Sequence, residues 1–178
     1  MDRKRGYYIH FDGKKTAGVE KKIRMQIKEL QKLFDIEEIL VEDIERNLLE
    51  RIAGLWPTKS ISRDYSQALE RINNADFIYV RRTVADHEYY QFLKQIKCNN
   101  PKCKIIVEIF TYPYDKDEFL KWNAWPFYFK ELIWRPHLGK VIDRFVTYSE
   151  DDQIFGIKTI CTINGIDVKS EKVVEKKK

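Results

Sequence analysis

The chain has 178 residues, enough for one domain with a full-sized hydrophobic core. Hydrophobic residues make up 43% and aromatic residues 13%, which excludes an intrinsically disordered chain although 34% of the residues are charged. Much of the formal net charge of +5 lies at the two ends, in Arg3–Arg5 and Lys176–Lys178. No basic stripe that would read duplex DNA lies between them, so no nucleic-acid partner is expected.

The cysteines and histidines give no sign of a metal site. Cys98, Cys103 and Cys161 are an odd number without the second pair that a zinc site needs, so reduced thiols in a cytoplasmic protein are expected. The three histidines are isolated, and His10 lies inside an expected strand as a satisfied core residue. No apolar stretch approaches the roughly 20 residues that span a bilayer. The basic N-terminus also lacks the apolar segment of a signal peptide.

Apolar runs alternate with amphipathic segments from the start of the chain. A strand is predicted at Tyr7–Phe11, followed by a helix at Gly18–Phe34 with apolar residues at three- and four-residue spacing. A strand at Glu38–Val41 follows. Residues 42–62 suggest one helix that Pro57 ends.

The alternation continues through the rest of the chain. Further helices are predicted at Ser62–Asn73, Asp86–Lys97, Lys116–Trp134 and Pro136–Ile142. Further strands are predicted at Asp76–Arg81, Lys104–Ile109, Arg144–Tyr148 and Thr159–Ile163. This pattern predicts an α/β fold, a Rossmann-like three-layer domain with a mostly parallel sheet and helices on both faces. Ligands of such sheets bind at the carboxyl ends of the strands, so site residues are expected there.

The loop after the first strand contains Gly13, Thr16 and Gly18. Its glycines would let backbone N–H groups approach a phosphate, at the positive end of the following helix. The loop matches neither common glycine-rich phosphate motif, and glycine before a helix is more often only turn chemistry. Taken alone, an ordinary turn is favoured.

Five short segments, taken together, resemble the N-terminal, acceptor-side domain of family 4 glycosyltransferases, which have the GT-B fold. They are Asp12-Gly13 with Gly18–Ile23, Ile78–Arg81, Glu108–Asp115, Val146–Ser149 and Asn164–Asp167. The resemblance covers Tyr7 to Asp167 and implies one domain over residues 1–167. It implies that Asn164, Gly165 and Asp167 lie where the chain crosses into the donor-binding domain. Residues 168–178 are then the start of a linker, a lysine-rich tail expected to be disordered.

The resemblance implies a retaining transferase that moves a sugar from a nucleotide-sugar donor to a glycan or lipid-linked acceptor. Gly13, Thr16 and Gly18 would lie against the donor diphosphate, with the nucleotide sugar as substrate and no cofactor. The family's donor-binding domain is not in this sequence, so this chain alone is expected to be inactive. The alternative is a non-catalytic module that pairs with a separate donor-domain chain or binds glycan or membrane.

Two charged residues at the ends of expected strands are candidates for the acceptor cleft. Glu108 ends a strand expected in the core, where an ionised carboxylate is costly unless paired. It therefore either pairs with a neighbour such as Arg81 or lies at the cleft. Arg81 could grip an anionic acceptor or a phosphate bidentately. Four loop residues complete the expected cleft: Thr111, Tyr112, Tyr114 and Ser149.

An aromatic cluster with interspersed basic residues lies late in the chain. It comprises Trp122, Trp125, Phe127, Tyr128, Phe129 and Trp134, with Lys116, Lys121, Lys130 and Arg135. Packing beneath long loops is the default interpretation. A patch that faces the inner surface of the membrane is the second one, because basic and aromatic surfaces suit that interface.

Overall fold

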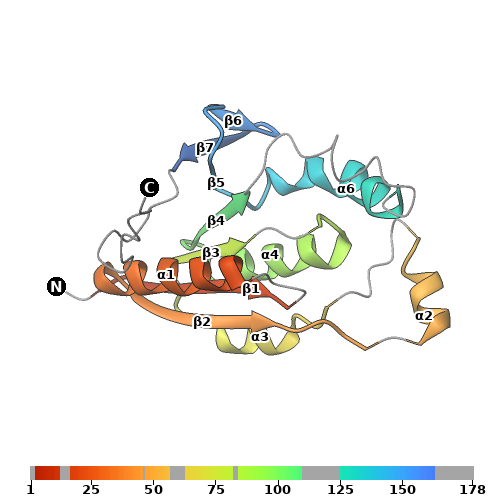
Figure 1. Ribbon diagram of the computed structural model, residues 1–178, viewed down its shortest axis with the longest axis horizontal. Coiled ribbons are helices and arrows are strands. Elements are labelled where there is room, and N and C mark those ends of the chain that lie inside the picture. The colour runs from red at the N-terminus through yellow and green to blue at the C-terminus, as the bar shows by residue number, and fades with distance from the viewer. Residues whose placement is uncertain are drawn as a thin grey trace, which may run out of the picture.

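A computed structural model of the chain describes residues 3–12, 17–45, 47–56, 63–81, 84–109 and 125–162. Within these ranges one seven-stranded sheet has the order β2-β1-β3-β4-β5-β7-β6 (Figure 1). All neighbouring strands are parallel except β6 and β7. The strands are β1 (Arg5–Phe11), β2 (Asp35–Val41), β3 (Phe77–Arg81), β4 (Lys104–Ile109), β5 (Arg144–Thr147), β6 (Gln153–Ile154) and β7 (Ile157–Cys161).

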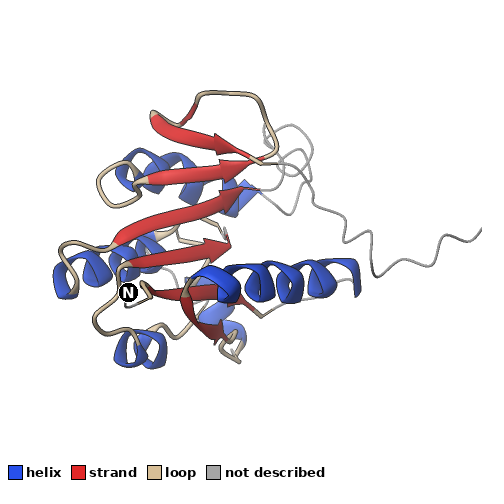
Figure 2. Ribbon diagram, turned by 90° about the vertical axis from the view of Figure 1, so that its left-hand side faces the viewer, coloured by secondary structure: helices blue, strands red, loops and turns tan. Residues whose placement is uncertain are grey.

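Helices lie on both faces of the sheet, which confirms the predicted α/β three-layer domain. They are α1 (Ala17–Leu33), α2 (Leu48–Ala53), α3 (Ser66–Arg71), α4 (His87–Asn99) and α6 (Trp125–Leu138). Figure 2 shows α1 on one face and the other covering helices on the opposite face. The described helices therefore form two unequal layers, one on each face of the sheet.

The winding of the chain reverses between β1 and β3. From β1 the chain moves through α1 to β2 at one edge, and from β3 it moves through α4 to β4 and on to β5. In open parallel sheets this switch point is where the strand ends leave room for a ligand. The carboxyl ends of β1 and β3 are therefore the first place to look for a site.

Two hydrophobic clusters hold the layers together. Because successive side chains of a strand point to opposite faces, Tyr7 and Ile9 pack into the larger cluster beneath α3 and α4. Tyr8 points the other way and packs with Ile23 and Ile27 of α1. Burial on both faces explains the continuous apolar and aromatic run of β1.

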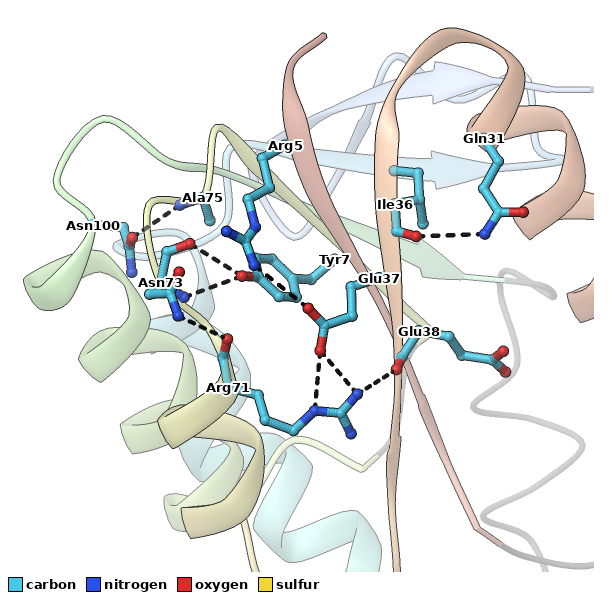
Figure 3. Close-up of polar contacts among 10 residues, drawn as sticks. All are labelled: Arg5, Tyr7, Gln31, Ile36, Glu37, Glu38, Arg71, Asn73, Ala75 and Asn100. Carbon is cyan, nitrogen blue, oxygen red and sulfur yellow. Dashed lines mark hydrogen bonds and ion pairs between the residues drawn. The ribbon is translucent and has the colours of Figure 1, made fainter.

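Polar contacts fix the amino end of the sheet (Figure 3). The Tyr7 hydroxyl donates to the carbonyl of Asn73 at 3.0 Å. The Arg71 guanidinium donates to Glu37 Oε1 at 2.9 Å and to the carbonyl of Glu38 at 3.0 Å. These bonds tie the end of α3 to the two strands beside it, so this end of the sheet is occupied by structural contacts.

The described residues between 42 and 56 do not form the single predicted helix. Asp43 forms an isolated antiparallel bridge with Arg63, and α2 covers only six residues. Asn47 starts α2 by accepting from the N–H of Glu50, whose side chain bonds back to the N–H of Asn47. This capping box fixes the start of the helix at a point that its apolar pattern did not reveal.

Other elements also differ from the predictions. The helix predicted from Ser62 is shorter, as α3. The predicted break before Pro136 is wrong, because α6 runs through this proline to Leu138. The hairpin of β6 and β7 was not predicted, since its turn uses Phe155 at φ 52° with Gly156 at φ 76°. A bulky residue at positive φ is not a turn signal in sequence.

Candidate functional site

A buried carboxylate gathers polar groups near the carboxyl ends of β3 and β4. The Glu108 side chain is 1% exposed. Its Oε1 accepts from Gln26 Nε2 at 2.9 Å and lies 3.3 Å from Lys22 Nζ and 3.4 Å from Tyr148 Oη. Its Oε2 lies 3.6 Å from Arg81 Nη1, and this oxygen has no hydrogen-bond partner within the described part of the chain. We call these five residues the Glu108 cluster.

Sheet register and helix spacing bring the cluster together. Arg81 and Glu108 are directly aligned across β3 and β4, so their side chains leave the same face of the sheet. Lys22 and Gln26 are four residues apart and lie on one side of α1, which covers that face. Tyr148 follows the end of β5.

Gln26 connects two sides of the cluster. Its amide oxygen accepts from Tyr8 Oη at 2.7 Å and from Arg81 Nη1 at 3.3 Å, while its amide nitrogen donates to Glu108. Both ends of the amide are thus used, which fixes the orientation of the side chain. A buried polar network of this kind specifies how α1 is seated on the sheet.

Lys22 is the cluster cation that a ligand can reach. Its side chain is 26% exposed, whereas Arg81 and Glu108 are buried. The Nζ donates to the Tyr148 hydroxyl and lies 4.2 Å from the centre of that ring. Burial lowers the pKa of Lys22, and the negative charge of Glu108 partly offsets this. One carboxylate against two cations leaves an excess positive charge, which suits an anionic ligand.

Tyr8 and Tyr79 form the floor of the cluster. Their rings stack at 5.2 Å between centroids. Burial raises the pKa of both hydroxyls. The negative charge of Glu108 adds to this, whereas Arg81 lowers it. Both tyrosines therefore stay neutral at physiological pH and act as hydrogen-bonding groups.

Of the predicted cleft residues, the structure brings Arg81 and Glu108 together. The pairing of Glu108 with Arg81, the first of the two alternatives, is confirmed. The place of Glu108 at an acceptor cleft stays a prediction. Ser149 is outside the Glu108 cluster, because its N–H bonds Thr147 Oγ1 at 3.1 Å within the turn after β5.

Gly18 lies in the first turn of α1. The other predicted site residues lie outside the described residues: Gly13, Thr16, Thr111, Tyr112, Tyr114, Asn164, Gly165 and Asp167.

The prediction for His10 is confirmed. The residue is buried in β1, and its Nε2 lies 2.7 Å from Glu38 Oε1 on the neighbouring strand. Within the described ranges no group of three or more His, Cys, Asp or Glu residues is placed to hold a metal ion. No described helix is long and apolar enough to cross a membrane.

Sequence reasoning missed Lys22, Gln26 and Tyr148 as site residues. Two of these residues could have been found from the sequence. Lys22 and Tyr148 belong to two of the segments that carry the family resemblance. Gln26 gave no signal, because a glutamine on an amphipathic helix is usually solvated. Its contact with Glu108 follows only from the seating of α1 on the sheet.

A second polar group fixes the chain after β3. Glu131 of α6 is buried, accepts from the N–H of Ala85 at 2.6 Å and pairs with Arg135 at 3.3 Å. Asp86 caps α4 by accepting from the N–H of Tyr89 at 2.9 Å. These bonds position Ala85 and Asp86 at the start of α4.

The aromatic segment divides between core and surface. Trp134 packs against the larger core cluster, as the default interpretation expected. Trp125, Phe127 and Phe129 are exposed. Lys130, which the membrane-facing interpretation placed on the surface, is buried and donates to the carbonyl of Gly54 at the end of α2.

Comparison with known proteins adds no family to this description, because neither a protein-family model nor a curated protein matches the chain.

Proposed function

We propose that the chain is the acceptor-side domain of a retaining GT-B-type glycosyltransferase, which transfers a sugar from a nucleotide-sugar donor to a glycan or lipid-linked acceptor. One observation supports this most. Lys22, Arg81, Glu108 and Tyr148 come from four separate segments that resemble this family, and they meet at the carboxyl edge of the sheet. In a transferase of this type, the four residues would belong to one binding site.

The electrostatics of the cluster fit a diphosphate leaving group. Lys22 and Arg81 supply positive charge near the switch point, and Gly18 lies in the first turn of α1, whose N-terminal end also favours anions. Glu108 holds both cations in place. Charge that develops on the departing diphosphate would be stabilised by these fixed groups, and the reaction needs no protein nucleophile.

The proposal requires a second, donor-binding domain, in the same chain or a separate one, that holds the nucleotide sugar across a cleft. The domain described here would supply one wall and the acceptor contacts, and would be inactive alone. It would act in the cytoplasm, with peripheral contact at the inner face of the membrane.

Isothermal titration with UDP- and GDP-sugars tests the proposal on two proteins. One is the 178-residue chain, and the other is extended into the downstream coding sequence. Tight binding and sugar transfer by the extended protein alone is the expected result. In that protein Lys22→Met should weaken donor binding about tenfold. Lys32→Met, an exposed lysine at the other end of α1, is the matched control and should leave binding unchanged.

Two results would contradict the proposal. Equally tight binding by the 178-residue chain would indicate a stand-alone nucleotide-binding domain. An extended protein that neither binds nor transfers any UDP- or GDP-sugar would remove the assignment to this family.

A further inference from the structure

Helix α2 turns an apolar arc toward solvent. Leu55 and Trp56 continue the helix by one turn, because their N–H groups donate to the carbonyls of Ile52 and Ala53. At 3.6 residues per turn, five large apolar side chains share an arc of about 120°. They are between 46% and 77% exposed, and we call them the α2 stripe: Leu48, Leu49, Ile52, Leu55 and Trp56. A surface helix normally turns such an arc toward the core.

Helix α6 shows the same reversal. Its charged residues Lys130 and Glu131 are buried and bond backbone groups of Gly54 and Ala85. Four large apolar side chains on the other side of the helix are between 40% and 50% exposed and share an arc of about 100°. We call them the α6 stripe: Trp125, Phe129, Leu132 and Ile133.

The two stripes match in length and width. Each extends over nine consecutive positions, 48–56 and 125–133, which is about 12 Å at a rise of about 1.5 Å per residue. Ile52 and Phe129 lie at the centres of the two stripes. Lys130 donates to the carbonyl of Gly54, so α2 and the start of α6 are joined at one edge of the fold (Figure 1).

The exposed area of the two stripes is large enough for a stable dimer. At about half exposure, their nine side chains present on the order of 1,000 Å² of apolar surface. A standard protein–protein interface covers about 800 Å² of each partner, whereas the largest apolar patch of a typical monomer is roughly 300–600 Å². The stripes also have the composition of a homodimer interface, which is rich in aromatic and aliphatic residues and poor in charge.

We propose that the chain forms a symmetric homodimer in which the α2 stripe of each copy packs against the α6 stripe of the other. A two-fold axis makes this contact twice, so both stripes of both copies are covered and no apolar stripe is left for a third copy. Helical stripes of equal length allow the side chains of one helix to pack between those of the other.

A second copy fits the two stripes better than a lipid surface does. Helices that lie on membranes carry lysine and arginine beside the apolar side. Neither stripe contains a basic residue, and Lys130 is buried. Helix α6 covers the face of the sheet opposite α1 (Figure 2), so the dimer leaves the Glu108 cluster beneath α1 uncovered. The dimer is independent of sugar transfer.

Sedimentation velocity at several concentrations of the 178-residue chain tests the proposal. The chain should sediment as a dimer, at twice its mass of 21.5 kDa. Ile52→Lys and Phe129→Glu should each raise the dissociation constant of the dimer at least about tenfold, because each places an unpaired charge in an apolar contact. Both side chains are exposed in the single chain, so the circular dichroism spectra of the variants should match that of the parent.

Leu33→Lys is the matched control, since Leu33 is 69% exposed at the end of α1, outside both stripes. Its dissociation constant should equal that of the parent. Equal weakening by Leu33→Lys and by Ile52→Lys would show that the dimer does not use the stripes, and a parent that is monomeric at every concentration would overturn the proposal.

Mixing the two stripe variants tests the reciprocal contact itself. In a mixed dimer, the site of Ile52→Lys in one copy faces the site of Phe129→Glu in the other, and the second contact is that of the parent. The mixture should therefore dimerise at least about tenfold more tightly than either variant alone. A mixture that stays monomeric would mean that α2 does not pack on α6 of the partner. No nucleotide sugar enters these measurements, so their failure is distinct from failure of the transferase assignment.

Discussion

Arg81 and Glu108 occupy aligned positions on neighbouring parallel strands, and their charged groups meet at 3.6 Å while both side chains are buried. Neither charge would be tolerated there alone, because removing one partner of a buried pair leaves the other desolvated and unpaired. Lys22 approaches the same carboxylate from α1. The pair therefore links the two central strands to the helix that covers them.

Glu108→Gln should lower the free energy of unfolding by about 3 kcal/mol, because Arg81 and Lys22 lose their counter-charge in a buried setting. Urea unfolding followed by circular dichroism measures this. The matched control is Glu20→Gln, which breaks an exposed pair with Arg24 and should cost less than about 0.5 kcal/mol. Equal changes in the free energy of unfolding for the two substitutions would mean that the buried pair stabilises the fold no more than the exposed pair does.

Stability should fall as the pH rises above about 10. Burial raises the pKa of Tyr8, Tyr65 and Tyr79 in the folded protein, whereas unfolded tyrosines ionise near pH 10. The folded state then binds more protons than the unfolded state, so the free energy of unfolding decreases with pH. Urea unfolding at several alkaline pH values should show a smaller decrease for Tyr79→Phe. Tyrosinate absorbance that reports all ten tyrosines ionising near pH 10 in the intact fold would contradict this.

Asp143 should stabilise the fold at neutral pH and lose this effect in acid. Burial opposes its ionisation, but hydrogen bonds from Lys97, the N–H of Ile105 and Lys104 outweigh burial and lower its pKa. Asp143→Asn should therefore cost about 1–2 kcal/mol at pH 7.

The difference between Asp143→Asn and the parent should shrink as the pH falls below about 3.9, where the unfolded aspartate becomes protonated. Unfolding titrations across that range measure it. Asp152→Asn, at an exposed carboxylate before β6, is the control and should change stability by no more than about 0.5 kcal/mol. A cost of Asp143→Asn that stays constant from pH 7 into acid would contradict the prediction.

A thiol reagent should modify two cysteines quickly and the third only on unfolding. Cys98 and Cys161 are exposed, whereas Cys103 is buried, and burial raises its pKa to about 11. The thiolate is the reactive form, so Cys103 is protected by both access and ionisation. Mass spectrometry of the labelled chain checks this, and rapid labelling of Cys103 in the folded protein would show the prediction to be wrong.

The candidate site was partly visible in sequence for a specific reason. Arg81 and Glu108 stand out because each is a charge at the end of an apolar run, and a charge in that place needs a partner. Lys22 and Gln26 did not stand out, because polar residues on an amphipathic helix are ordinary. Their role depends on how α1 is rotated against the sheet, which no local pattern records.

The difference between local sequence patterns and contacts that depend on packing also explains which fold predictions were right. β4 was predicted at its observed bounds, because a buried strand between turn residues has a clear local pattern. The start of α2 depends on reciprocal bonds between Asn47 and Glu50, and the hairpin before β7 depends on Phe155 at positive φ. Neither is an effect of hydrophobic periodicity.

The sequence by itself determined the alternation of strands and helices, since apolar periodicity distinguishes a strand from a helix over a few residues. It therefore determined the α/β class and the parallel sheet. Only the tertiary structure decided which way the apolar arcs of α2 and α6 face. Periodicity locates an apolar arc on a helix but not the direction in which it points. That direction follows from long-range bonds, Lys130 to Gly54 and Glu131 to Ala85, which turn the charged side of α6 inward.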